Sequence, residues 1–130
     1  PRFKAPLLAC TKIGTIRAPR KPRSFRASSR DGNAYPGEPL TLMTGPRMRP
    51  EIIMRTQCVA RYDVTLRFLP IIEVIHGGEK LPASWLDRFA VEDGFAHFGE
   101  LEEFWAETHK EISVFAGVRV CWQRSFIEEA

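Results

Sequence analysis

Residues 61–68 carry the pattern that most constrains the fold of this chain. Apolar Tyr62, Val64, Leu66 and Phe68 alternate there with polar residues. A period of two over this length is typical of a β-strand with one face against a core and one face toward solvent. A helix would place these four side chains all around its axis, so the segment predicts a strand in a half-buried sheet.

The rest of the chain indicates more strands and two short helices. Further strands are expected over residues 13–17, 39–43, 71–76 and 114–122. Gly77-Gly78 is typical of a hairpin turn. Helices are expected over residues 84–90, with Ser84 as N-cap, and over residues 100–109, with Leu101, Phe104 and Trp105 as the apolar stripe. Residues 3–10 contain Pro6 and favour an edge strand or an irregular segment.

This order of elements predicts one α+β domain over residues 1–130. Apolar residues make up 44% of the chain and charged residues 27%, as in ordinary soluble proteins. The apolar runs are too short to span a bilayer, so we expect no membrane partner. Three widely spaced cysteines argue against a secreted disulfide framework and favour a cytoplasmic protein with reduced thiols. The His and Cys spacing indicates no metal site, and no cofactor is expected.

Charge is distributed unevenly, although the net charge is only +3. Residues 1–30 contain nine Lys or Arg and no acidic residue, and the other ten basic and all sixteen acidic residues follow. A block of one sign faces solvent or an anion, and phosphate is the commonest such anion. Residues 18–34 are basic, rich in Pro and Ser, and predict a long loop. A solvated basic segment without a ligand is the alternative.

Three motifs resemble the ASCH family, a branch of the PUA-like superfamily. Lys12, Thr15 and Arg17 match the family pattern Gly-x-Lys-x-x-Thr-x-Arg, with Cys10 at the position of the glycine. Residues 35–45, followed by Arg47, resemble the second block of the family. Asp93-Gly94-Phe95, with Leu101 and Phe104-Trp105 behind it, resembles the loop of acid, Gly and Phe before the second helix.

The resemblance implies a small, mostly antiparallel β-barrel flanked by two or three short helices. It also implies a pocket where Lys12, Thr15, Arg17 and Asp93 converge, and RNA or a modified nucleoside as the partner. Basic residues in and after the first motif would contact phosphates. The positions expected to bind nucleic acid are Arg17, Arg20, Lys21, Arg23, Arg26 and Arg47.

Catalysis is the alternative to binding. Some members of the family remove the acetyl group from acetylcytidine, and others are linked to RNA cleavage. By resemblance, Lys12, Thr15 and Asp93 would be the catalytic residues of an amidohydrolase. A base would activate the Thr15 hydroxyl, and Asp93, or else Glu92 beside it, would orient Lys12 or carry a proton.

The spacing of Lys12 and Thr15 does not decide whether their side chains lie close together. Residues 12 and 15 of a regular strand point to opposite faces. They meet only across a turn, which Gly14 would permit. A third possibility is a protein-interaction domain that docks a partner on the glutamates of residues 100–109, although a solvated helix face explains them equally well.

Overall fold

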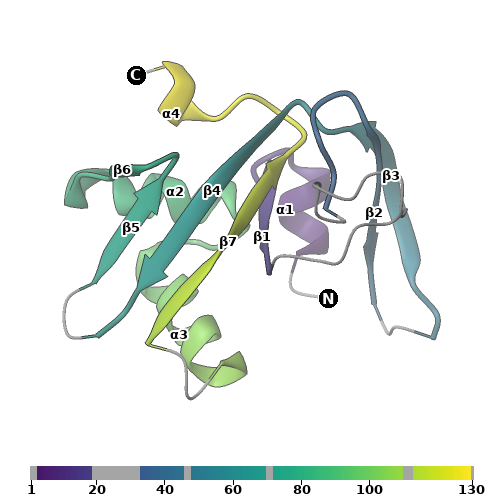
Figure 1. The fold of residues 1–130 in the computed structure, drawn as a ribbon. Helices are drawn as coiled ribbons and strands as arrows, with labels where there is room; N and C mark the ends of the chain where they lie inside the picture. Colours follow the sequence, from purple (N-terminus) through teal and green to yellow (C-terminus); the bar gives the residue numbers. More distant parts are fainter. Residues whose placement is uncertain (1–2, 19–32, 46–47, 70–71, 110–112, 130) are drawn as a thin grey trace.

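The fold centres on a five-stranded antiparallel sheet, shown in a computed structural model that describes residues 3–18, 33–45, 48–69, 72–109 and 113–129 (Figure 1). The strand order is β1-β7-β4-β5-β6. These strands are β1 (Gly14–Arg17), β4 (Ala60–Arg67), β5 (Glu73–His76), β6 (Glu79–Lys80) and β7 (Val114–Cys121). A separate antiparallel ribbon consists of β2 (Pro39–Thr44) and β3 (Glu51–Gln57).

Short helices complete an α+β fold. They are α1 (Lys4–Leu8), the 3-10 turn η2 (Ala83–Trp85), α2 (Leu86–Glu92), α3 (Phe98–Thr108) and α4 (Phe126–Glu129). Figure 1 shows α2 and α3 behind the five-stranded sheet, and the β2–β3 ribbon on the far side of β1 and α1. Within the described ranges the strand pairing does not close into a barrel, and four α-helices replace the expected two or three. No helix there is long and apolar enough to cross a membrane.

The strand pattern of residues 61–68 is confirmed. Val64 and Leu66 of β4 are buried in the main core with Phe89 of α2 and with Leu101 and Trp105 of α3. The Gly77-Gly78 turn is also confirmed, since it joins β5 to β6 with φ values of 60° and 87°. Two positive φ angles give a hairpin turn whose twist matches that of the flanking strands.

The helical expectations need two corrections. Residues 4–8 form α1 instead of an edge strand, because Pro6 lies in the first turn, where its missing N–H has no partner within the helix. Ser84 does not cap α2, whose N-cap residue is Trp85 and carries no side-chain cap bond. Asp87 instead accepts a hydrogen bond of 3.0 Å from the N–H of Phe98, at the start of α3.

β3 lies in a segment for which the sequence pattern predicted no strand. Exposed Ile52 precedes two half-buried apolar residues, Ile53 and Met54, so no alternation is visible. A two-stranded ribbon is marginally stable without packing. Here it is joined to the main body at Val59, whose N–H donates to the Cys121 carbonyl at 2.8 Å, and by Cys58 and Leu40, which pack with Val118 and Val120 of β7.

Candidate functional site

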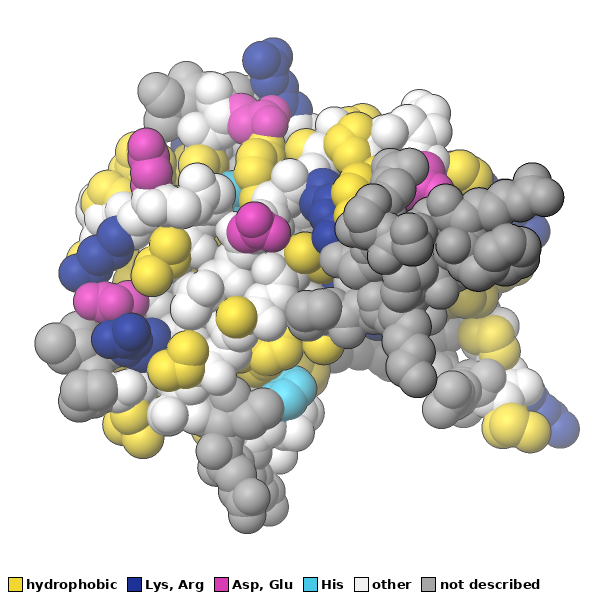
Figure 2. Space-filling view, viewed as in Figure 1, with side chains coloured by type: hydrophobic (Ala, Val, Ile, Leu, Met, Phe, Trp, Pro, Cys, Tyr) yellow, Lys and Arg dark blue, Asp and Glu magenta, His cyan; other side chains and the backbone are white. Residues whose placement is uncertain are grey.

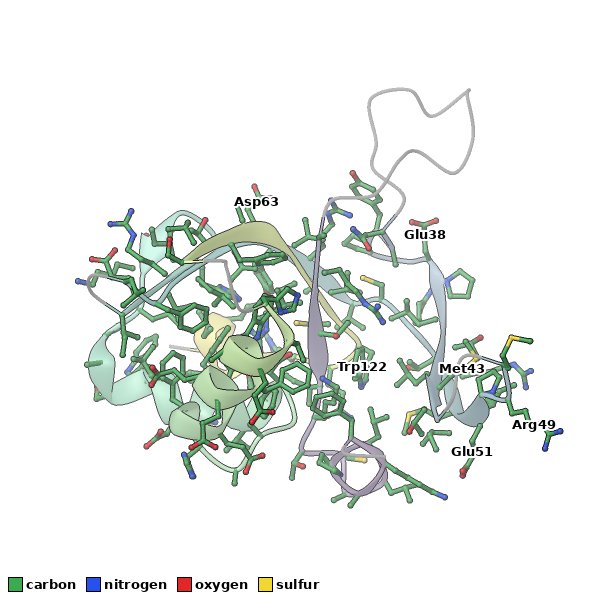
Figure 3. The ribbon with its side chains drawn as sticks, turned by 90° about the horizontal axis from the view of Figure 1, so that it is seen from below. Glu38, Met43, Arg49, Glu51, Asp63 and Trp122 are labelled. Atoms are coloured by element: carbon green, nitrogen blue, oxygen red, sulfur yellow. The ribbon has the colours of Figure 1, made fainter. Side chains whose placement is uncertain are left out.

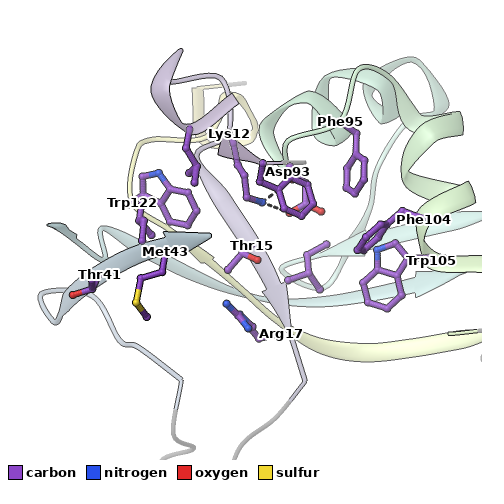
Figure 4. Close-up of a pocket in the computed structure, with 14 residues that line it drawn as sticks. Lys12, Thr15, Arg17, Thr41, Met43, Asp93, Phe95, Phe104, Trp105 and Trp122 are labelled. Carbon is purple, nitrogen blue, oxygen red and sulfur yellow. Dashed lines mark hydrogen bonds and ion pairs between the residues drawn. The ribbon is translucent and has the colours of Figure 1, made fainter. Parts of the chain in front are cut away.

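A pocket of about 290 Å³ opens between β1 and the β2–β3 ribbon (Figure 4). Its polar lining includes all four residues that the sequence motifs were expected to bring together, which are Lys12, Thr15, Arg17 and Asp93. Its aromatic lining comes from three parts of the chain and consists of Phe3, Phe95, Phe104, Trp105 and Trp122. The pocket therefore joins a wall of aromatic rings to a small group of charged and hydroxyl side chains.

Lys12 reaches the pocket because it lies just before β1. The N–H of Ile13 donates to the Glu92 carbonyl at 2.8 Å, and the Ile13 carbonyl accepts from the N–H of Trp122 at 2.9 Å. These bonds set Lys12 beside the end of α2. The opposite-face rule for strands does not separate Lys12 from Thr15, since Lys12 is outside the strand. Gly14 does not form the expected turn. It allows β1 to pack closely against Cys121 of β7, because a Cβ at this position would lie 2.9 Å from Cys121 Sγ.

The Lys12 ammonium is surrounded by acceptors. Nζ donates to the Asp93 carbonyl at 2.7 Å and to the Gly14 carbonyl at 2.9 Å, and lies 3.6 Å from Asp93 Oδ1. It also lies 4.4 Å from the centroid of the Phe3 ring, a cation–π distance. Two hydrogen bonds to backbone carbonyls and an ion pair with Asp93 hold this side chain in one place.

Asp93 is positioned by the way α2 ends. Gly94 follows it with φ of 99°, the N–H of Gly94 donates to Val91, and the N–H of Phe95 donates to Ala90. This pair of bonds is a Schellman motif, which needs a left-handed residue at the glycine position. A Cβ on Gly94 would lie 2.8 Å from Lys12 Cδ, so glycine also makes room for the lysine.

The choice between Asp93 and Glu92 follows from their different surroundings. Glu92 accepts hydrogen bonds from Arg119 (2.8 Å), from the Ser125 hydroxyl (2.7 Å) and from the N–H of Phe126 (2.9 Å). It does not line the pocket, whereas Asp93 does. Asp93 Oδ1 is buried and has no hydrogen-bond partner in the structure. Asp93 is therefore the acid available to a ligand, and Glu92 is part of the core.

Burial sets the electrostatics of the Lys12–Asp93 pair. Removal from water lowers the pKa of Lys12, and the nearby Asp93 charge opposes that shift. Removal from water likewise raises the pKa of Asp93, while the charges of Lys12 and Arg119 oppose it. Both shifts follow because a low-dielectric site disfavours the charged form of each group. The pocket thus holds an acid and an amine whose proton affinities lie closer together than in water.

Thr15 and Arg17 face the ribbon side of the sheet. In the register with β7, Thr15 is opposite Val120 and Arg17 is opposite Val118, and directly paired residues share a face. Figure 3 shows Trp122 between β1 and the ribbon, so its ring closes the space that these side chains enter. Among the described residues, no hydrogen bond or ion pair of the Arg17 side chain is present.

The remaining basic positions lie outside the described residues. They are Arg20, Lys21, Arg23, Arg26 and Arg47. Over the described surface, Figure 2 shows Lys and Arg interspersed with Asp and Glu, with no field of one sign on that face. The prediction that these five residues bind nucleic acid stays a prediction.

Sequence reasoning did not anticipate several parts of the pocket. Phe104 and Trp105 were expected as the apolar stripe of a helix behind the third motif, and Trp122 as part of the last strand, and none of the three was expected to line the pocket. Thr41, Leu42 and Met43 of β2 also line the pocket. No local sequence pattern distinguishes Trp122 from the other apolar residues of the predicted strand over residues 114–122. Comparisons with protein-family models, curated proteins and solved structures found no match for this chain.

Proposed function

We propose that this protein is an ASCH-type, PUA-like domain that binds RNA through one nucleoside held in the pocket between β1 and β2. In this proposal the five-stranded sheet and the ribbon are two parts of a small antiparallel barrel that is open at the pocket. The observation that carries the proposal is the pocket itself, which combines aromatic walls with Lys12, Thr15, Arg17 and Asp93.

The chemistry of the pocket suits a nucleobase. Unstacked bases bind proteins by stacking on aromatic faces and by hydrogen bonds along their edges. Trp122 and Phe3 supply apolar ring surface, and the buried Asp93 Oδ1 supplies an acceptor without a partner. An amino or imino group of a base would satisfy that oxygen, which otherwise carries a desolvation cost.

Binding of a short single-stranded RNA tests this proposal directly. We expect binding that weakens steeply with salt and quenching of tryptophan fluorescence, because Trp105 and Trp122 line the pocket. Thr15→Val keeps the shape of a half-buried side chain and removes its hydroxyl, so it should weaken binding without changing the fold. Lys80→Gln, at the opposite edge of the sheet, is the control. Absence of binding at low salt would refute the proposal.

Amide hydrolysis is the second candidate, and two observations favour it. Lys12, Thr15 and Asp93 line one pocket, and burial lowers the pKa of Lys12. An uncharged lysine is able to accept the proton of the Thr15 hydroxyl as that oxygen attacks an acyl carbon. In the structure, however, Nζ donates to two backbone carbonyls, and its remaining proton must leave before it acts as a base.

Incubation with acetylcytidine, followed by detection of acetate and cytidine, tests the second candidate. If the protein is a hydrolase, Lys12→Ala and Thr15→Ala each abolish turnover while Thr15→Ser retains part of it. Turnover that is unchanged in folded samples of both alanine variants would show that these residues do not carry the reaction. Circular dichroism of each variant controls for loss of fold.

A further inference from the structure

The pocket described above continues into a second hollow along β1. This second compartment has a volume of about 280 Å³. Both compartments are lined by β1 and β2, and each lies near the lower end of the size range of small-molecule sites. They share five lining residues, which are Thr15, Arg17, Thr41, Leu42 and Trp122. The two hollows are therefore neighbouring parts of one cleft, and a single ligand is able to occupy both.

The two compartments differ in chemistry. The first is walled by aromatic rings, and its two buried charges, on Lys12 and Asp93, compensate each other. The second has aliphatic walls from Leu40 and Val120, with hydroxyl and amide groups at Thr15 and Asn33. Its described lining contains one charged residue, Arg17, and no carboxylate. The first compartment thus suits a flat, uncharged ring, and the second suits an anion.

Arg17, and not Lys12, is the cation available to such an anion. Lys12 Nζ is committed to the Asp93 and Gly14 carbonyls and to the Asp93 carboxylate. Arg17 is exposed at the junction of the two compartments and makes no ion pair with a carboxylate among the described residues. A guanidinium matches phosphate geometry with two parallel N–H donors, which an ammonium cannot do.

We propose that the cleft binds a nucleotide unit, with its base in the aromatic compartment and its phosphate in the second compartment against Arg17. The site would then select phosphate-bearing ligands over free nucleosides. This inference rests on the proposed function of the pocket and goes beyond it by separating the two ligand classes. The phosphate is either a terminal monophosphate or the diester that links two residues of an RNA strand.

Calorimetric titration with four probes tests the inference. The probes are cytidine, its 5′- and 3′-monophosphates and the dinucleoside monophosphate CpC, with the matching adenosine series beside them. We expect at least one phosphate-bearing probe to bind about tenfold or more tightly than its nucleoside, as a charge-assisted contact implies. Weaker binding of CpC than of a monophosphate points to a terminal phosphate, and tighter binding of CpC points to the diester.

Variants of Arg17 assign the effect to that side chain. Arg17→Gln should remove the preference for phosphate, so that a nucleoside and its monophosphate bind the variant with similar affinity. It should also reduce the salt slope of CpC binding by about 0.7, the value for one phosphate of a single strand. Arg17→Lys should retain part of the preference, and Lys80→Gln all of it.

The possible outcomes separate this inference from the proposed function. If nucleosides bind as tightly as their phosphates, the inference is wrong and the binding function stands. If the preference for phosphate survives Arg17→Gln, the assignment to Arg17 is wrong. If none of the probes binds at low salt, the inference and the proposed function both fail.

Discussion

His76 makes the stability of this fold sensitive to acid. It is buried in β5, at 5% exposure, with Nε2 3.1 Å from Nη1 of Arg119 on β7. Arginine remains protonated and only donates, so Nε2 accepts and the imidazole is neutral. The rings of Tyr62 on β4 and Phe89 on α2 cover it at centroid distances of 4.4 and 6.2 Å. Protonation would therefore place two cations in contact in the core.

The size of the effect follows from the shift in pKa. Burial, reinforced by the Arg119 charge, lowers the pKa of His76 to about 4, whereas an unfolded histidine titrates near 6.5. Between these values the unfolded chain binds more protons, so stability is full above about pH 6.5 and falls as the pH drops toward 4. Linkage gives a loss of about 2 kcal/mol at pH 5 and about 3 kcal/mol at pH 4. A domain has about 5–15 kcal/mol in total.

Urea unfolding of the wild type and of His76→Gln at pH 7 and pH 5 measures this effect. Glutamine keeps an acceptor for Arg119 but does not titrate, while the carboxylates titrate equally in both proteins. We expect His76→Gln to have a lower free energy of unfolding than the wild type at pH 7. Between pH 7 and pH 5, the free energy of unfolding of the variant relative to the wild type should rise by about 2 kcal/mol. A difference that is the same at both pH values would refute the reasoning.

Three further pairs of substitutions test the local geometry, each by urea unfolding. Cys10 has φ of 61°, so Cys10→Gly should stabilise the protein by about 1 kcal/mol, and Cys10→Ser should not. Gly94→Ala should cost about 1–3 kcal/mol and more than Gly37→Ala, because both residues have positive φ but only Gly94 lacks room for a Cβ. Glu92→Gln should cost about 3 kcal/mol or more, whereas Glu51→Gln, in an exposed ion pair with Lys4, should cost at most about 1 kcal/mol.

Local patterns explain which parts of the fold the sequence predicts. The alternation of β4 and the Gly77-Gly78 turn are short-range signals, and both are confirmed. The sequence does not reveal where α1 ends, because a cysteine stands in place of the glycine that is usual in a Schellman motif. The bonds of this motif run from the N–H of Cys10 to the Leu7 carbonyl and from the N–H of Thr11 to the Pro6 carbonyl. The sequence does not predict the ribbon strand β3 either, since too few of its side chains are buried for an alternation of apolar and polar residues to appear.

The site depends on contacts that no local pattern contains. Lys12 and Asp93 are 81 residues apart, and the order of the family motifs is the sequence feature that groups them. The pocket also needs Trp122 and the β2 ribbon, whose positions follow from sheet pairing and packing. Part of the third motif has a structural reason, because Gly94 and Phe95 form the Schellman end of α2. A glycine followed by an apolar residue is expected there, whatever the pocket binds.

Glu92 and Asp93 are adjacent in the chain but lie in different surroundings, because successive residues at the end of α2 point in different directions. The Glu92 carboxylate is held by Arg119, Ser125 and the N–H of Phe126, and its carbonyl accepts from Ile13, next to Lys12. A buried ion pair of this kind adds little net stability, but removal of one partner is costly. The pair therefore serves to fix where α2 ends. With that end fixed, Asp93 forms an ion pair with Lys12 without being a member of the core network, and its Oδ1, which accepts no hydrogen bond from the described residues, stays available to a ligand.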